Sequence, residues 1–266
     1  MSSASSTPTR IYETSRGQYA NVHRGPSIAS IKPGVDIGAV LNSSISLFFR
    51  NIWLITKLVL VIVTPFEIFK ALSIVEIAGN WQLAVGTFAL QIFCNILIAP
   101  ALIYALMTVM QTGVAPGINE SYRWGLARLG KFSLCAAMAL ALEMLGTALC
   151  IIPGIFLFLA FELVYPIAVL ENHSPIDILK RSYHLTAGYR WNILGATFLM
   201  SLMMGIASAP ASIGVSLLVF NGVDFWPLQA LAAVISDILS EGLTVLSLVI
   251  YLSIVRTLES TQSVIE

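Results

Sequence analysis

Six long apolar stretches constrain this sequence more than any other feature. A transmembrane helix needs about 20 mainly apolar residues, and stretches of this kind cover approximately residues 52–72, 81–110, 132–151, 155–170, 191–220 and 228–256. With 57% hydrophobic and only 11% charged residues, the chain has too few charged side chains to cover a water-soluble surface. The composition excludes a soluble globular domain and a nucleic-acid-binding protein. It predicts an all-α polytopic membrane protein with six transmembrane helices.

The basic residues predict the orientation of these helices. Twelve of the fourteen Lys and Arg residues lie on one side of the predicted spans, namely Arg10, Arg16, Arg24, Lys32, Arg50, Arg123, Arg128, Lys131, Lys180, Arg181, Arg190 and Arg256. By the positive-inside rule, both termini are expected in the cytoplasm. We expect a disordered cytoplasmic tail over residues 1–33, the transmembrane domain over 34–258 and a short cytoplasmic tail over 259–266.

The chain also carries a repeated pattern. An amphipathic, basic segment of roughly 15 residues precedes the first, third and fifth spans, and Ser44, Ser121 and Ser182 occupy similar places in the three segments. Trp53 and Trp191 each follow the matching serine by nine residues. The pattern predicts three copies of one unit, each a cytoplasmic interfacial helix followed by a two-helix hairpin. The alternative is that any membrane protein with a cytoplasmic N-terminus alternates basic segments with hairpins.

Four prolines lie inside the predicted spans: Pro65, Pro100, Pro166 and Pro210. Each removes a backbone donor, so we expect a kink at each of these positions. Neighbouring helices can satisfy the freed carbonyl groups within a membrane.

Several short motifs resemble a known family. They are Pro153-Gly154, Pro166, Glu171, the run Leu179-Lys-Arg-Ser182, the run Leu185-Thr-Ala-Gly188 and Trp191, with Pro33-Gly-Val-Asp-Ile-Gly38 near the start. This pattern is similar to the membrane domain found beside some glycerophosphoryl diester phosphodiesterases and in stand-alone bacterial multi-pass proteins. The resemblance implies a six-helix bundle in a bacterial cytoplasmic membrane. It does not imply the phosphodiesterase activity, which in that family belongs to a separate soluble barrel for which this chain has no room.

Acidic residues inside the predicted spans are candidates for function. Glu67, Glu143, Glu162, Asp237 and Glu241 all lie in apolar stretches. A charge at the bilayer centre costs about 2.5–3.5 kcal/mol on insertion scales, so such acids are expected to be protonated, paired or in contact with water. Asp237, Ser240, Glu241 and Thr244 recur at helical spacing and share one face of the sixth span.

Two interpretations of these polar residues remain open. In one, the sixth span and the hydroxyl residues of the fifth span line a polar cavity that passes a proton, a cation or a polar solute; those hydroxyl residues are Thr197, Ser201, Ser208, Ser212 and Ser216. In the other, the acids bond hydroxyl groups of neighbouring helices and hold the bundle together.

A basic and aromatic group near the fifth span predicts lipid contacts. Lys180, Arg181 and Arg190 lie close to Trp191 in the sequence, as in sites that bind anionic headgroups. The alternative is ordinary anchoring of a span at the cytoplasmic interface. The sequence has no phosphate-binding glycine loop, nucleophile elbow or Cys/His cluster, so we expect no catalytic residues, no metal site and no cofactor.

These observations together favour a non-enzymatic accessory protein that binds membrane lipids, a membrane protein partner or a second copy of itself, and no nucleic acid. The alternative function is a small transporter or channel that uses the intramembrane carboxylates.

Overall fold

The computed structural model describes residues 35–72, 80–221 and 225–265, with side chains described up to residue 258. The described residues are helical and contain no strand, which confirms the all-α class. The predicted tail over residues 1–33 lies outside the described residues. Residues 259–265, expected as a C-terminal tail, continue the last helix.

The helices, in chain order, are α2 (Ile37–Arg50), α3 (Ile52–Leu72), α5 (Trp81–Thr112), α6 (Ile118–Leu149), α7 (Ile151–Phe161), α8 (Val164–Leu170), α9 (Pro175–Thr186), α10 (Arg190–Phe220) and α11 (Trp226–Ile265). Six candidate spans are long and apolar enough to cross a membrane: α3, α5, α6, α7 with α8, α10 and α11. The chain is a multi-pass membrane protein.

Two of the three predicted interfacial segments form separate helices. Between α9 and α10 the chain turns at Gly188, whose φ of 90° is a conformation that glycine adopts at little cost. Between α2 and α3 the single residue Asn51 separates the helices and donates to the Leu47 carbonyl. The second segment is not separate, because Gly130 stays helical and residues 118–131 continue directly into the span as the first part of α6. The expectation of a third independent interfacial helix was therefore wrong.

Three of the four prolines lie inside uninterrupted helices. Pro65, Pro100 and Pro210 are accommodated within α3, α5 and α10. Near Pro166 the helix is interrupted, with Glu162 and Leu163 separating α7 from α8. Pro166 then lies in the first turn of α8, where its missing N–H leaves no helical hydrogen bond unmade.

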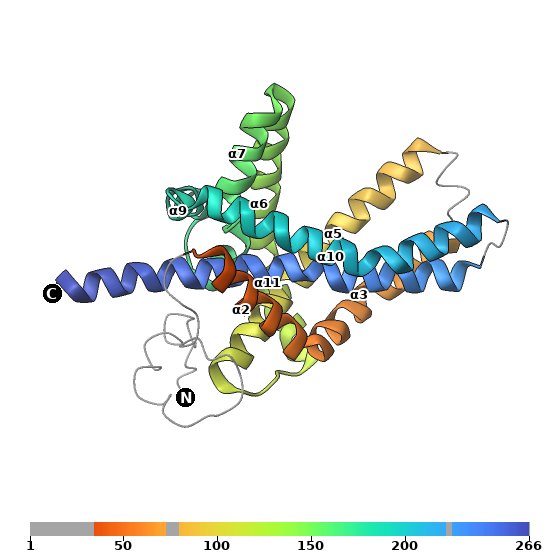
Figure 1. Ribbon diagram of the computed structural model, residues 1–266, viewed down its shortest axis with the longest axis horizontal. Helices are drawn as coiled ribbons and strands as arrows, with labels where there is room; N and C mark the ends of the chain where they lie inside the picture. Colours follow the sequence, from red (N-terminus) through yellow and green to blue (C-terminus); the bar gives the residue numbers. More distant parts are fainter. Residues whose placement is uncertain (1–34, 73–79, 222–224, 266) are drawn as a thin grey trace, which may run out of the picture.

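The hairpins converge at one end and diverge at the other. Figure 1 shows the far ends of the α6–α7 and α10–α11 hairpins pointing in different directions, while α2 and α9 lie where the hairpins meet. The short α8 packs there against α5, α6, α9 and α11. We call this meeting point the basic end. It is defined by four basic residues from four helices: Arg50 of α2, Lys131 of α6, Arg181 of α9 and Arg190 of α10. The long α11 packs against α2, α3, α5, α8 and α10 and is the most buried of the spans, whereas α10 is the least buried.

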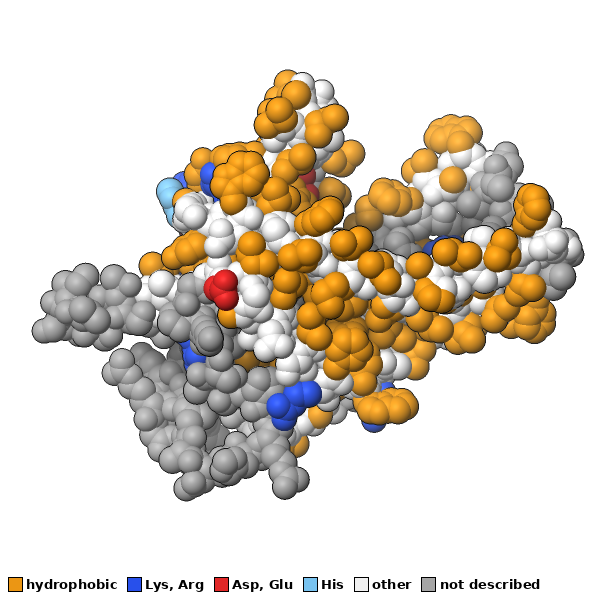
Figure 2. Space-filling model, in the orientation of Figure 1, with side chains coloured by type: hydrophobic (Ala, Val, Ile, Leu, Met, Phe, Trp, Pro, Cys, Tyr) orange, Lys and Arg blue, Asp and Glu red, His pale blue; other side chains and the backbone are white. Residues whose placement is uncertain are grey.

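Away from the basic end the surface is apolar. Hydrophobic side chains cover the outer parts of the hairpins in Figure 2. Exposed large residues there include Trp81 and Phe88 on α5, Leu149 on α6 and Phe220 on α10. In a bilayer these side chains meet lipid tails, so their exposure is compatible with a membrane-embedded surface.

Close helix packing in the α6–α7 hairpin depends on two glycines. A Cβ added at Gly154 would lie 2.8 Å from the Thr147 Cα, and one added at Gly146 would lie 2.6 Å from the Leu157 Cδ1. Small residues at such positions let the helix backbones approach one another.

The three serines that suggested a repeat share one environment. Ser44, Ser121 and Ser182 are each 0% exposed. The Ser44 and Ser121 hydroxyls donate to a carbonyl four residues earlier in the chain, and that of Ser182 donates to the Ala160 carbonyl of α7. Trp53 and Trp191, at matching positions, are 76% and 82% exposed. Equivalent positions therefore have equivalent burial, as the repeat predicts.

Candidate functional site

An ion pair on α3 is the first element of an intramembrane polar site. The Lys70 Nζ donates to the Glu67 Oε1 at 2.6 Å, one turn apart on the helix. Glu67 is almost fully buried, whereas the Lys70 side chain is partly exposed. The pairing explains how a carboxylate is tolerated within an apolar span, because a buried charge is costly unless it is paired.

Two further acids, on α11, belong to the same region. Asp237 lies within electrostatic range of Glu67 and Lys70, and Glu241 within range of Asp237. We refer to these four residues as the acidic cluster. One carboxylate oxygen of Asp237 and one of Glu241 are buried without a hydrogen-bond partner. The structure thus brings together three of the five intramembrane acids predicted as site residues.

The other polar residues predicted on this face of α11 have different environments. Ser240 is exposed, and its hydroxyl donates to the Asp237 carbonyl. Thr244 is half-buried and interacts with Glu241. Thr244 therefore belongs beside the acidic cluster, whereas Ser240 lies at its edge and faces outward.

Glu143 and Glu162 form a separate pair on the α6–α7 hairpin. Both side chains are half-buried. They lie within electrostatic range of each other and of the Tyr165 hydroxyl. Among the described residues, neither Glu143 nor Glu162 interacts electrostatically with a member of the acidic cluster. The five acids thus form two groups rather than one site.

The hydroxyl stripe predicted on the fifth span does not face the acids. The Ser208, Ser212 and Ser216 hydroxyls donate to carbonyls three or four residues earlier in α10, and Ser212 and Ser216 are exposed. Ser201 is also exposed, so only Thr197 is buried. Hydroxyl groups commonly satisfy themselves within their own helix in this way. The hypothesis of a cavity lined jointly by the fifth and sixth spans is not supported by these contacts.

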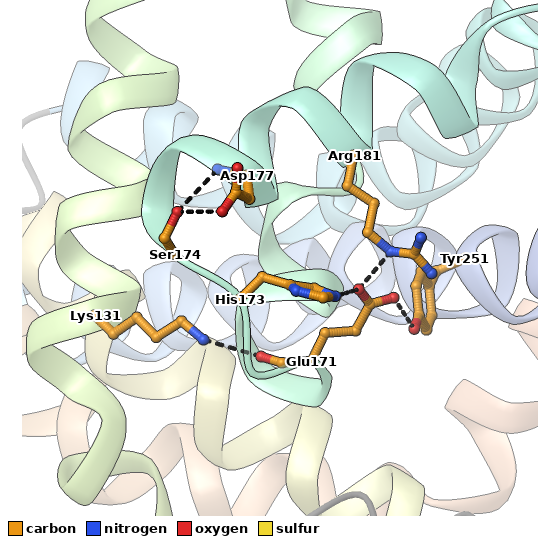
Figure 3. Close-up of polar contacts among 7 residues, drawn as sticks. All are labelled: Lys131, Glu171, His173, Ser174, Asp177, Arg181 and Tyr251. Carbon is orange, nitrogen blue, oxygen red and sulfur yellow. Dashed lines mark hydrogen bonds and ion pairs between the residues drawn. The ribbon is translucent and has the colours of Figure 1, made fainter.

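A second polar site lies at the basic end, centred on Glu171 at the end of α8 (Figure 3). The Glu171 Oε1 accepts a hydrogen bond from the Tyr251 hydroxyl at 2.8 Å. The Oε2 contacts the Arg181 Nε and lies 3.1 Å from the His173 Nε2. The Lys131 Nζ donates to the Glu171 carbonyl oxygen at 3.0 Å. We call these five residues the Glu171 cluster.

The Glu171 cluster joins parts of the chain that are distant in sequence. It connects α6 through Lys131, α9 through Arg181 and α11 through Tyr251 (Figure 3). Glu171 was predicted only as part of a family motif, and His173 and Tyr251 were not predicted as site residues. The available signal was an acid and a base flanking the turn between two helices, but the Tyr251 contact spans 80 residues and leaves no local pattern.

The predicted lipid-binding residues have separate roles. Arg181 is committed to Glu171. The Arg190 guanidinium carbon lies 4.1 Å from the Phe156 ring centre and 4.6 Å from that of Tyr183, and its Nη2 donates to the Tyr183 carbonyl. Lys180 and Trp191 are exposed. All four are at least partly exposed, but Arg181, whose side chain is 41% exposed, is paired with the Glu171 carboxylate.

No group of three or more His, Cys, Asp or Glu residues within the described part of the chain is arranged to hold a metal ion. Comparisons of the chain with protein-family models, with curated proteins and with solved structures find no match.

Proposed function

We propose that this chain is a non-enzymatic accessory protein of a bacterial cytoplasmic membrane and that it binds anionic lipid headgroups at its basic end. The observation that carries the proposal is the environment of Arg190. Its guanidinium is stacked on Phe156 and Tyr183 beside the exposed Trp191. An arginine oriented by aromatic rings at the edge of a span is well suited to a phosphate group.

The surroundings of Arg190 support the same function. Lys180 and His184 lie on the exposed face of α9, while Ile178 and Leu185 on its other face are buried. Figure 2 shows basic and histidine side chains beside hydrophobic ones in this region. An amphipathic helix at the headgroup level combines apolar burial with attraction to anionic lipids.

Native mass spectrometry of the protein extracted gently from its membrane tests the proposal. Replacing Lys180 and Arg190 with Gln is expected to reduce retained anionic lipid several-fold, with zwitterionic lipid unaffected. Arg123→Gln, an exposed basic residue on α6, is the matched control and is expected to retain lipid. Equal retention of anionic lipid by all three proteins would contradict the proposal.

A second candidate function is transport of a proton, a cation or a small polar solute. The acidic cluster favours it, because ionisable residues inside a membrane commonly mark transport pathways. Flux into vesicles that contain the purified protein tests this function. Asp237→Asn with Glu241→Gln is expected to abolish flux but to leave lipid retention intact, whereas unchanged flux would exclude a transport role for these residues.

A further inference from the structure

We propose that Asp237 and Glu241 form a proton-binding site in the membrane interior that is occupied at neutral pH. The proposal rests on the second candidate function, which uses the same acidic cluster, and it identifies the proton as the ligand of that cluster. It concerns equilibrium binding, so it stands whether or not the protein transports anything.

Charge balance is the first argument. The cluster contains three carboxyl groups, and Lys70 is the cation within it. The Lys70 ammonium is already bonded to Glu67 at 2.6 Å. Asp237 and Glu241 therefore have no cation of their own in the cluster, and an ionised carboxylate in apolar surroundings costs several kcal/mol without a partner. A proton shared by the two carboxyl groups lowers that cost.

Burial and unmatched oxygens are the second argument. Glu241 is 7% exposed, and its Oε2 has no hydrogen-bond partner. The Asp237 Oδ2 is also buried and unpartnered. A carboxylate needs several donors for its lone pairs, whereas a carboxylic acid carries its own donor and needs fewer.

The titratable groups that face the pair come from α3, α5 and α6. On α3 they are Glu67 and Lys70, and on α5 the thiol of Cys94. On α6 Tyr122 interacts with Glu241, but its hydroxyl proton is donated to the Leu58 carbonyl.

The α10 helix brings no titratable side chain between residues 191 and 220, and Met200 and Met204 lie against Gly242 beside Glu241. Within the described ranges, Lys70 is thus the one cation that interacts with Asp237, and none interacts with Glu241.

The depth of the pair is the third argument. Glu241 is ten residues from Tyr251 at the basic end, which is about 15 Å along a helix, and Asp237 is eleven residues from Trp226 at the other end, about 16 Å away. The hydrocarbon core of a bilayer is about 30 Å thick. Both carboxyl groups therefore lie near the middle of the span that α11 provides.

Infrared spectroscopy of the full chain in lipid nanodiscs at pH 7 tests the proposal. We expect a carboxylic-acid C=O band that is reduced in Glu241→Gln and reduced further when Asp237→Asn is added. Glu143→Gln removes an acid of the separate pair on the α6–α7 hairpin, and Asp177→Asn removes an exposed one. The band lost in the double variant should remain in both controls. A band unchanged by the double substitution would overturn the proposal.

Unfolding the wild-type chain supplies a test that needs no stable variant. Carboxyl groups that are protonated in the folded protein ionise on exposure at pH 7, so unfolding in weak buffer should release protons to an indicator dye. Glu241→Gln should release about one proton fewer than wild type. No release would overturn the proposal, as would loss of the acid band when sodium is added at constant pH, since the ligand would then be a metal cation.

Discussion

The Tyr251 hydroxyl donates a hydrogen bond of 2.8 Å to the Glu171 carboxylate, joining α11 to the end of α8 across 80 residues of sequence. Both groups are largely buried. Hydrogen bonds to charged groups contribute about 1.5–3 kcal/mol to stability. Tyr251→Phe keeps the ring and removes only the donor, so it should lower the free energy of unfolding by about 2 kcal/mol. Denaturant unfolding in detergent micelles measures the effect.

Removing the carboxylate should cost more than removing the phenol. Glu171→Gln leaves Arg181 without its ion-pair partner and weakens the contact with Tyr251. We expect a larger loss of stability than for Tyr251→Phe, together with increased proteolysis between α8 and α9. His173→Asn, which changes an exposed side chain of the same cluster, is the control and should have a small effect. Equal stability of all these variants would show that the cluster does not hold the basic end together.

The Glu67–Lys70 ion pair predicts that a second substitution restores the stability lost through the first. Lys70→Met leaves the buried Glu67 carboxylate without its cation and should destabilise the protein by about 2–3 kcal/mol. Adding Glu67→Gln removes the unpaired charge and should restore most of that loss. A double-mutant cycle on thermal unfolding in detergent measures the coupling. Additive effects of the two substitutions would mean that the pair contributes little.

Close packing in the α6–α7 hairpin predicts that an alanine at Gly154 lowers the stability of the protein, whereas an alanine at Gly205 on α10 does not. In Gly154→Ala the new methyl group would overlap Thr147, including its backbone, so we expect a loss of about 1–3 kcal/mol. Gly205→Ala on α10 meets no atom within 4 Å and should be neutral or slightly stabilising. Comparing their melting temperatures tests the predicted packing, and similar values would contradict it.

The serines at matching positions of the repeat differ in their hydrogen bonds, so their substitution is predicted to lower stability to different extents. Ser182 donates between helices, to the Ala160 carbonyl of α7, whereas Ser44 bonds within its own helix. Ser182→Ala should cost about 1 kcal/mol, because it leaves a buried carbonyl with only a long contact to Thr186. Ser44→Ala should cost less, since the backbone hydrogen bonds of its helix remain. Denaturant unfolding of the two variants measures this difference.

The spans could be predicted from sequence because their signal is local. A run of about 20 apolar residues needs no partner to be recognised, and the first predicted range, 52–72, coincides with α3. The start of α9 also depends on residues close in sequence, because the Ser174 hydroxyl accepts a hydrogen bond from the Asp177 backbone N–H and Pro175 occupies the first helical position. The continuity of the second basic segment, residues 118–131, with the span of α6 was not predicted, because Gly130 permits a turn but does not require one.

The candidate sites could be predicted only in part. The acids of the sixth span were found from their spacing, but the division of five acids into two groups depends on which hairpins touch. Sequence spacing also placed Ser240 and Glu241 on one face, although the first is exposed and the second is buried. Helix rotation and neighbour identity are long-range properties, and a single sequence does not encode them in a local pattern.

The central position of α11 has a consequence for biosynthesis. Of the described helices, α11 is synthesised after α2, α3, α5, α8 and α10, all of which pack against it. Hairpins inserted earlier by the translocon must therefore stay in the bilayer without their common partner until α11 has been inserted. A chain that terminates before α11 would contain five of its six spans and still lack the element that joins them.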